Sequence, residues 1–347
     1  MPVPCRALRV VLMSFAALSL SGCYLMQAAS GQMQIVSKRE PISDVISDPA
    51  TPEKLRARLE YVSAARDFAS QELGLPDNPS YRSYADLGRP YVVWNVFATE
   101  EFSVEPRRWC FPIAGCVVYR GYFSESSAQR YARSLRAKGD DAMVGGIAAY
   151  STLGHFRDPI LNTMMGWDDA QLASTLFHEL AHQVVYVPGD SRFNEAFATA
   201  VEEVGLERWL NSRGRAQEMQ GWRQRRERQE QFIDLLLHTR EKLQALYASG
   251  ISVEQMRASK QEIFGQLKFD YTQLRAQWNG YGGYDRWFDR ALNNAHLVSA
   301  ATYHACLPGF RRVLASVNGD LPRFYEEVRK IADLPQEERA AAVCEGG

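Results

Sequence analysis

The sequence lacks the features that would place it in several specialised classes of protein. Its 40 Lys and Arg residues are balanced by 41 Asp and Glu residues, giving a formal net charge of −1, so no basic excess points to a nucleic-acid partner. No internal repeat is evident, which argues against a repeat architecture. Hydrophobic residues make up 46% of the 347 positions. This balance is typical of an ordinary globular protein with ample material for a core.

Long hydrophobic runs are also missing, apart from a short one near the N-terminus. The apolar run from Val10 to Leu20 follows a basic start, which is typical of a secretory signal peptide and too short for a membrane-spanning helix. The Leu-Ser-Gly-Cys sequence that ends at Cys23 resembles the bacterial lipobox. It predicts removal of residues 1–22, acylation of Cys23 and a lipid anchor in the bacterial envelope. Tyr24, where Asp would favour retention in the inner membrane, indicates the outer membrane, with the protein facing the periplasm.

Cysteine is scarce, with six in the chain. Export would place these residues in an oxidising compartment, where thiols can pair. Setting aside the two within the signal region leaves four, which allow three pairings. The segment "CFPIAGC" places Cys110 and Cys116 around a Pro-Gly turn, so this disulfide is favoured, with Cys306–Cys344 as the remaining pair. Free buried thiols are the alternative.

Histidine is equally rare, yet two of the six histidines lie four residues apart in "FHELAHQ". Residues i and i+4 share one face of an α-helix, so the imidazoles of His178 and His182 can bind the same ion. Zinc prefers nitrogen and carboxylate donors, and its catalytic sites keep one position for water. Glu179 follows the first histidine and can act as general base towards that water. The motif therefore predicts a zinc site.

The residues around the motif favour a helix. Asp168 with Gln171 three residues later resembles a capping box. The two histidines lie on a separate face from the apolar residues. These apolar residues recur at helical spacing: Leu172, Leu176, Leu180 and Val184.

A third ligand is needed, and two glutamates compete for the role. A metzincin histidine is excluded because Val185 and Pro188 stand where that motif needs Gly and His. If two antiparallel helices fold about Pro188, Glu195 lies roughly 3 Å along the axis from the level of the histidines and Glu202 roughly 7.5 Å.

The comparison with thermolysin-like enzymes points both ways. Their longer interval between histidine and glutamate suits Glu202, but their glutamate typically follows an Asn, as Glu195 follows Asn194 here. Glu195 is therefore the favoured ligand. Glu202 is the alternative ligand, or a carboxylate that orients a ligand histidine.

The rest of the sequence predicts an α+β, helix-rich fold. Strands are indicated by β-branched and aromatic residues, and helices by apolar residues at helical spacing. The expected parts are a tether (23–50), a single domain (51–335) and a tail (336–347). Within the domain we expect a first helix (about 52–73), a small sheet (about 88–152), the metal-site helices (about 169–210) and a helical hairpin (about 213–278).

Several segments resemble a known family. "AYSTLGHFRDPI", "FHELAHQ", "FNEAFATAVEEVG" and "NNAHLVSAATYH" are similar to bacterial exported proteins described as predicted zinc aminopeptidases. The resemblance implies a gluzincin-like peptidase with a zincin-like core and a peptide substrate. It implies His178, His182 and Glu195 as zinc ligands and Glu179 as base. In zinc peptidases, the strand before the metal helix commonly pairs with the substrate backbone.

The resemblance also implies a donor for the oxyanion. Gluzincins take it from a Tyr or His late in the chain, and Tyr303 and His304 are the candidates here. Two other functions are compatible with the sequence: a zinc hydrolase of peptidoglycan cross-links, and a non-catalytic lipoprotein that scaffolds envelope complexes. The intact His, Glu and His argue against the second. No pattern indicates a particular oligomeric state.

Overall fold

The computed structural model describes residues 24, 26–111, 115–149, 151–302 and 306–344. The predicted signal peptide, the predicted lipidation site Cys23 and the predicted oxyanion donors Tyr303 and His304 lie outside the described residues. Within them, no helix is both long enough and apolar enough to cross a membrane.

The described part of the chain is rich in helix and contains three small sheets, which fits the predicted α+β, helix-rich class. The strands are β1 (Arg39–Pro41), β2 (Ser83–Ala85), β3 (Val93–Thr99), β4 (Trp109–Phe111), β5 (Gly115–Val117), β6 (Arg120–Tyr122), β7 (Asp141–Ile147) and β8 (Ile160–Leu161). The α-helices are α2 (Ile42–Ser47), α3 (Glu53–Gln71), α4 (Glu125–Arg136), α5 (Asp169–Ala181), α6 (Ser191–Ser212), α7 (Glu218–Tyr247), α8 (Val253–Gln277), α9 (Asp285–Phe288), α10 (Leu307–Ser316), α11 (Leu321–Ala332) and α12 (Gln336–Val343). Two 3-10 helices, η1 (Asn162–Met164) and η2 (Asn294–Thr302), complete the order.

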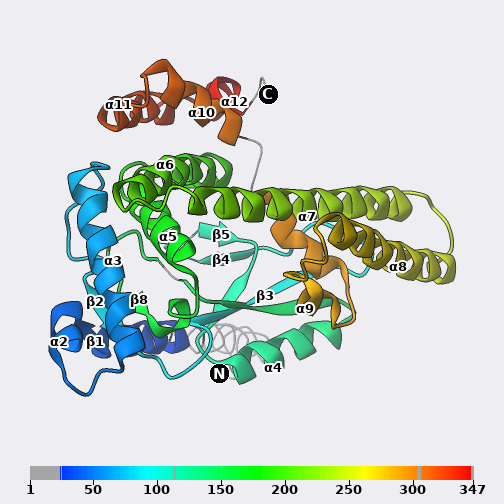
Figure 1. The fold of residues 1–347 in the computed structure, drawn as a ribbon. Coiled ribbons are helices and arrows are strands. Elements are labelled where there is room, and N and C mark those ends of the chain that lie inside the picture. Colours follow the sequence, from blue (N-terminus) through cyan, green and yellow to red (C-terminus); the bar gives the residue numbers. More distant parts are fainter. Residues whose placement is uncertain (1–23, 25, 112–114, 150, 303–305, 345–347) are drawn as a thin grey trace, which may run out of the picture.

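The sheet with the longest strands has the order β6-β3-β7 and is antiparallel, with Asn95 of β3 opposite Gly145 of β7. Helix α4 packs on one face, where Val96 and Ala98 of β3 meet Ala128 and Ala132 of the helix. Figure 1 shows α4 on one side of β3 and α7 on the other. Strand β7 forms one edge of this sheet, and the chain runs from it towards α5.

The main core lies between α3, α5, α6 and the C-terminal helices. Phe177 of α5, Phe197 of α6 and Phe310 of α10 are fully buried there. The rings of Phe197 and Phe310 lie 6.0 Å apart. In Figure 1 helices α10, α11 and α12 lie along the side of α6 that faces away from the sheet. Helix α6 is thus covered by α5 on one side and by α10 on the other.

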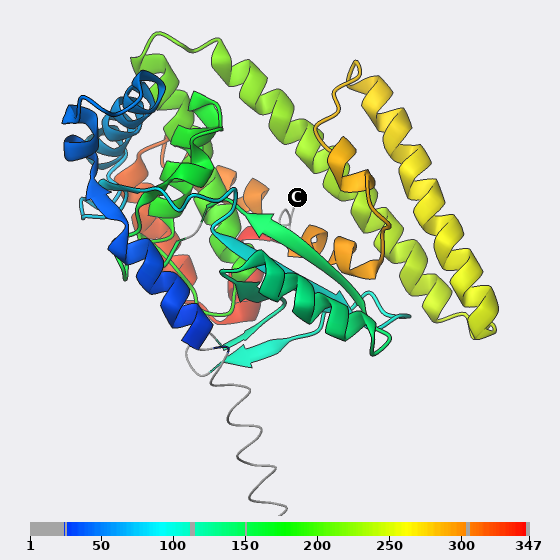
Figure 2. The ribbon, with the colours of Figure 1, turned by 90° about the horizontal axis from the view of Figure 1, so that it is seen from below.

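Helices α7 and α8 form the predicted hairpin and have a core of their own, which includes Phe232, Phe264 and Tyr271. Figure 2 shows the hairpin extending away from the rest of the molecule. Lys260 of α8 ties it to the sheet: its Nζ donates to Asp141 Oδ2 at 2.6 Å and to the carbonyl oxygen of Glu101 at 2.7 Å. Both side chains of the ion pair are largely buried, with 7% and 16% exposed.

Three expectations from the sequence differ from the structure. The predicted tether (23–50) contains a helix at 26–37, strand β1 and helix α2, because Ile35 and Ile42 are buried in the main core. The predicted tail (336–347) contains α12, where Val343 is 1% exposed. The apolar stripe of the motif helix does not extend to Val184, because α5 ends at Ala181.

Replacing Lys260 with Met should lower the free energy of unfolding by about 3 kcal/mol, because the largely buried carboxylate of Asp141 loses the ammonium group that neutralises it and keeps the hydrogen bond from the N–H of Asn294. Urea denaturation would measure the loss. The exposed Lys268 on the same helix offers a matched control, since Lys268→Met should change the stability by less than about 0.5 kcal/mol. Equal stabilities of the two variants would contradict this assignment.

Candidate metal centre

Helix α5 places the two histidines of the motif on the side of the helix next to α6. The Asp168 side chain caps its start by accepting a hydrogen bond from the backbone N–H of Gln171 at 2.8 Å. Leu172, Leu176 and Leu180 are buried and hold the helix in the core. The helix ends at Ala181, and His182 takes the C-cap position. The motif thus lies on the last turn of a buried, capped helix.

The turn between α5 and α6 is fixed by backbone conformation and by one asparagine. Gly189 adopts a φ of 83°, which favours glycine, and Asp190 then caps α6 by accepting a hydrogen bond from the N–H of Phe193. The Asn194 amide binds the backbone of Val187 in both directions, accepting from its N–H and donating to its carbonyl oxygen, each at 2.8 Å. These contacts fix the first turn of α6, where Glu195 follows Asn194.

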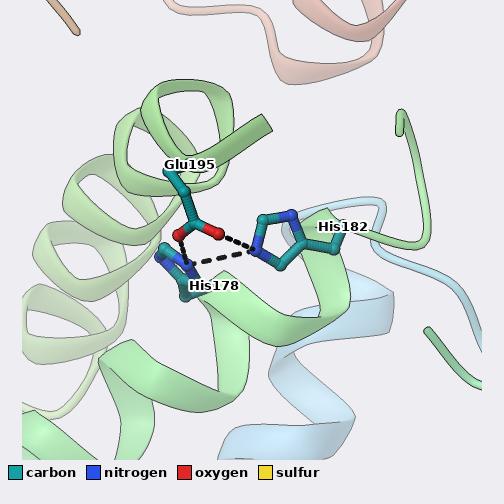
Figure 3. Close-up of side chains that lie close together, drawn as sticks. All are labelled: His178, His182 and Glu195. Atoms are coloured by element: carbon teal, nitrogen blue, oxygen red, sulfur yellow. Dashed lines mark hydrogen bonds and ion pairs between the residues drawn. The ribbon is translucent and has the colours of Figure 1, made fainter. Parts of the chain in front are cut away.

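The side chains of His178, His182 and Glu195 converge (Figure 3). The two Nε2 atoms of the histidines lie 3.2 Å apart. One carboxylate oxygen of Glu195 lies 3.2 Å from Nε2 of His178, and the other lies 3.8 Å from Nε2 of His182. Glu195, rather than Glu202, is therefore the glutamate that the structure brings against both Nε2 atoms.

Glu202 contacts the opposite nitrogen of the same imidazole. Its carboxylate lies 3.1 Å from Nδ1 of His178, and its side chain is only 11% exposed. A hydrogen on Nδ1 donates to this carboxylate, so a metal ion that displaces the proton of Nε2 would meet the lone pair of that nitrogen. Glu202 is thus placed to orient the ring of His178, which is the second of the two roles that the sequence suggests for it. Nδ1 of His182 has no hydrogen-bond partner among the described residues.

The carboxylates of Glu195 and Glu202 favour a positive charge between them, at the position of the His178 imidazole. Burial opposes the protonation of His178, but its hydrogen bonds to Glu195 and Glu202 raise its pKa to about 10. Burial and the charge of His178 lower the pKa of His182 to about 4. Although burial opposes ionisation, the contacts of Glu195 and Glu202 with His178 lower the pKa of both carboxyls. Two ionised carboxylates therefore flank the imidazoles.

The donor set has the geometry of a metal site. Ligands about 2.0–2.1 Å from zinc in a tetrahedral shell lie about 3.3 Å from one another. The two Nε2 atoms lie 3.2 Å apart and the nearest oxygen of Glu195 lies 3.2 Å from one of them, both close to this value. With one ligand atom from each residue, all three atoms lie within 4.8 Å of one another. Two imidazoles and one carboxylate are also the donor types that zinc takes in hydrolytic sites, and a metal ion would take the place of the proton on His178. His178, His182 and Glu195 can therefore hold a metal ion.

Glu179 is partly buried beside the cluster and near polar residues that the sequence did not point to. Burial raises the pKa of Glu179, and the carboxylate of Glu195 adds to this while His178 opposes it. Ser151 and Asp158 both interact with Glu179. Burial raises the pKa of Tyr81, and the charges of Glu179 and Asp158 add to this increase.

Asp158 organises the loop that carries Ser151. Its carboxylate accepts hydrogen bonds from the N–H of Thr152 at 2.8 Å and from the hydroxyl of Thr152 at 2.6 Å. Its backbone oxygen accepts from the N–H of Tyr81 at 2.6 Å. The hydroxyl of Tyr81 is buried and has no hydrogen-bond partner among the described residues. In the sequence, the Asp-Pro dipeptide in "GHFRDPI" indicates a turn at Asp158.

The four cysteines are paired as the sequence favours, Cys110 with Cys116 and Cys306 with Cys344. The first disulfide joins the neighbouring strands β4 and β5. The second joins the start of α10 to the residue that follows α12. Neither takes part in the metal cluster.

Comparison with known proteins identifies one family. A family model described as "Putative aminopeptidase" matches residues 23–343, which is most of the chain. No curated protein and no solved structure matches the chain.

Exchange of the two glutamates for alanine should separate their roles. Glu195→Ala should abolish tight zinc binding, because two histidines make an incomplete shell. Glu202→Ala should weaken the affinity about 10–100-fold, because His178 loses the group that orients its ring. Zinc titration against a competing chelator measures both variants on one scale. The opposite ranking would show that Glu202 is the ligand.

Proposed function

The chain belongs to the family described as "Putative aminopeptidase", and we propose that it is a zinc-dependent peptidase acting as an aminopeptidase. His178, His182 and Glu195 hold the zinc ion in this proposal. The observation that carries it is the convergence of two imidazole nitrogens and one carboxylate on one point, with all candidate ligand atoms within 4.8 Å of one another. The family supports a peptidase, and the donor set supports zinc.

The chemistry required is the attack of water on a peptide carbonyl. Zinc bound by these ligands would lower the pKa of a water molecule and polarise the carbonyl. Glu179 accepts the proton of the attacking water and transfers it to the leaving amine when the C–N bond breaks, which restores the carboxylate. Burial raises the pKa of Glu179, which makes this carboxylate a stronger base than an exposed one and suits a group that must take up a proton.

We place the substrate backbone along β7. This strand forms the edge of the β6-β3-β7 sheet, so it can accept a further strand. The chain leaves β7 at Ile147 and soon enters the loop of Ser151 and Asp158, which borders Glu179. A peptide paired with β7 would therefore run towards the metal cluster. Tyr303 and His304 stay predictions for the oxyanion donor.

We also propose that the protein is exported and anchored by lipid on Cys23 to the outer membrane, facing the periplasm. The lipobox and the preceding apolar run support this proposal. The helix at 26–37 begins soon after Cys23, so an anchor there would hold the folded part close to the membrane surface.

The Glu179→Gln variant should retain about one zinc ion per chain and lose peptidase activity about 10²–10⁴-fold, because the amide preserves the shape but cannot accept a proton. Metal analysis of the purified mature protein and hydrolysis of aminoacyl amides measure the two properties. The matched control is Glu207→Gln, since Glu207 is an exposed residue of α6 paired with Arg223. This control should keep full activity.

Activity of Glu179→Gln within a few-fold of the unchanged protein would place the base elsewhere. Hydrolysis of purified muropeptides, with no hydrolysis of peptide amides, would favour the peptidoglycan hydrolase. Zinc binding without hydrolysis of either substrate, and absence of zinc from the unchanged protein, would each contradict the proposed peptidase.

Labelling with a palmitate analogue tests the anchor. The unchanged protein should incorporate the label, and Cys23→Ser should not, because the acyl groups require the cysteine at the mature N-terminus. Cys5→Ser is the matched control and should keep the label, since Cys5 lies within the predicted signal peptide. Equal labelling of Cys23→Ser would contradict the proposed site.

A further inference from the structure

Arg339 is a buried charged residue near the end of the described chain. It lies on α12, is 7% exposed, and donates from Nε to Asp190 Oδ2 at 2.8 Å. Its Nη1 donates to the carbonyl oxygen of Leu334 at 2.8 Å. The ion pair with Asp190 is well shielded, because the two side chains are 9% and 17% exposed. Arg339 is therefore fixed at both ends of its guanidinium group.

Asp190 is the residue that begins α6. While one carboxylate oxygen faces Arg339, the other accepts the N–H of Phe193 at 3.2 Å. The guanidinium carbon of Arg339 also lies 5.6 Å from the centre of the Phe193 ring. Arg339 thus contacts the first turn of α6 twice, through its cap and through an aromatic side chain. Glu195 lies two residues after Phe193.

The position of Arg339 depends in turn on the Cys306–Cys344 disulfide. Cys344 is the C-cap of α12, and Cys306 precedes α10. The two helices touch closely, since a Cβ on Gly309 would lie 2.0 Å from the carbonyl oxygen of Val343. Helix α10 is anchored on α6 by an edge-to-face contact of Phe310 with Phe193, with ring centres 5.0 Å apart. The disulfide therefore holds α12 against a helix that is itself fixed on α6.

We propose that Arg339 is a positioning residue for Glu195, and that the Cys306–Cys344 disulfide sets the metal affinity of the site by holding Arg339 against the start of α6. This inference rests on the proposed metal site. Ligands bind tightly when their supporting contacts hold them in place before the ion arrives. The ion pair immobilises Asp190, the immobilised cap closes the first turn of α6, and the closed turn presents Glu195 to the two histidines.

The test compares variants that break the contact between α12 and the start of α6 from each of its two sides. Arg339→Ala removes the guanidinium group, while Asp190→Ser keeps an N-cap oxygen but is too short to reach Arg339. Each should weaken zinc binding about tenfold in chelator competition. The double variant should be no weaker than either alone, because both changes break the same contact. Arg339→Lys should recover part of the affinity.

Two further variants separate positioning from general stability. Arg208→Ala removes a hydrogen bond from α6 to the carbonyl oxygen of Gly319, at the other end of the helix, and should leave the zinc affinity within twofold. The paired change Cys306→Ser with Cys344→Ser should weaken it as Arg339→Ala does. Unchanged affinity in Arg339→Ala or in the paired cysteine variant would overturn the proposal. So would an equal loss in Arg208→Ala.

Hydrogen exchange of the metal-free protein gives a readout that does not depend on the zinc site. In Arg339→Ala the backbone amides of 190–197 should exchange faster than in the unchanged chain, and those of 205–212 should not. Equal exchange over 190–197 would overturn the role of Arg339. Faster exchange there in a protein that binds no zinc would instead refute the proposed function while leaving the contact between Arg339 and α6 in place.

Discussion

The imidazole of His178 lies between two carboxylates of one neighbouring helix, Glu195 at Nε2 and Glu202 at Nδ1. The two glutamates are seven residues apart, which is about two turns and about 10.5 Å along the axis of α6, so both face α5. A ring held from both sides has its tautomer and its orientation fixed together. The arrangement therefore requires α5 and α6 to pack side by side in one register, and the caps, the turn at Gly189 and the clamp of Asn194 on Val187 all set that register.

The sequence was most informative where local chemistry decides the structure. Asp168 and Asp190 cap their helices with their own side chains, and the apolar residues of α5 are buried at the predicted spacing. The sequence favoured Glu195 but left Glu202 as an alternative, and the structure supplies the reason: both lie on the face of α6 that contacts His178. The way in which α5 and α6 pack determines which carboxylate meets Nε2, and the two helices pack within the main core, where Phe177 and Phe197 are fully buried.

The structure differs from the expectation where distant partners decide the structure. Ile35 and Ile42 in the predicted tether are buried only because the main core lies beside them. Helix α12 reads as a polar tail, since its one buried charge, Arg339, is satisfied by Asp190 and by carbonyl oxygens that the sequence does not reveal. The proximity of Tyr81 and Asp158 to Glu179 could not be predicted for the same reason, because the contact between Tyr81 and Asp158 joins segments 77 residues apart in the chain.

The contacts of the site differ widely in the length of chain that they close. His178 and Glu195 are 17 residues apart, whereas Arg339 and Asp190 are 149 residues apart. Closing the longer loop costs about 2 kcal/mol more chain entropy, by the logarithmic dependence on loop length. Contacts of short range also form sooner during folding than those of long range. On these grounds α5 and α6 are expected to meet before α12 docks against them.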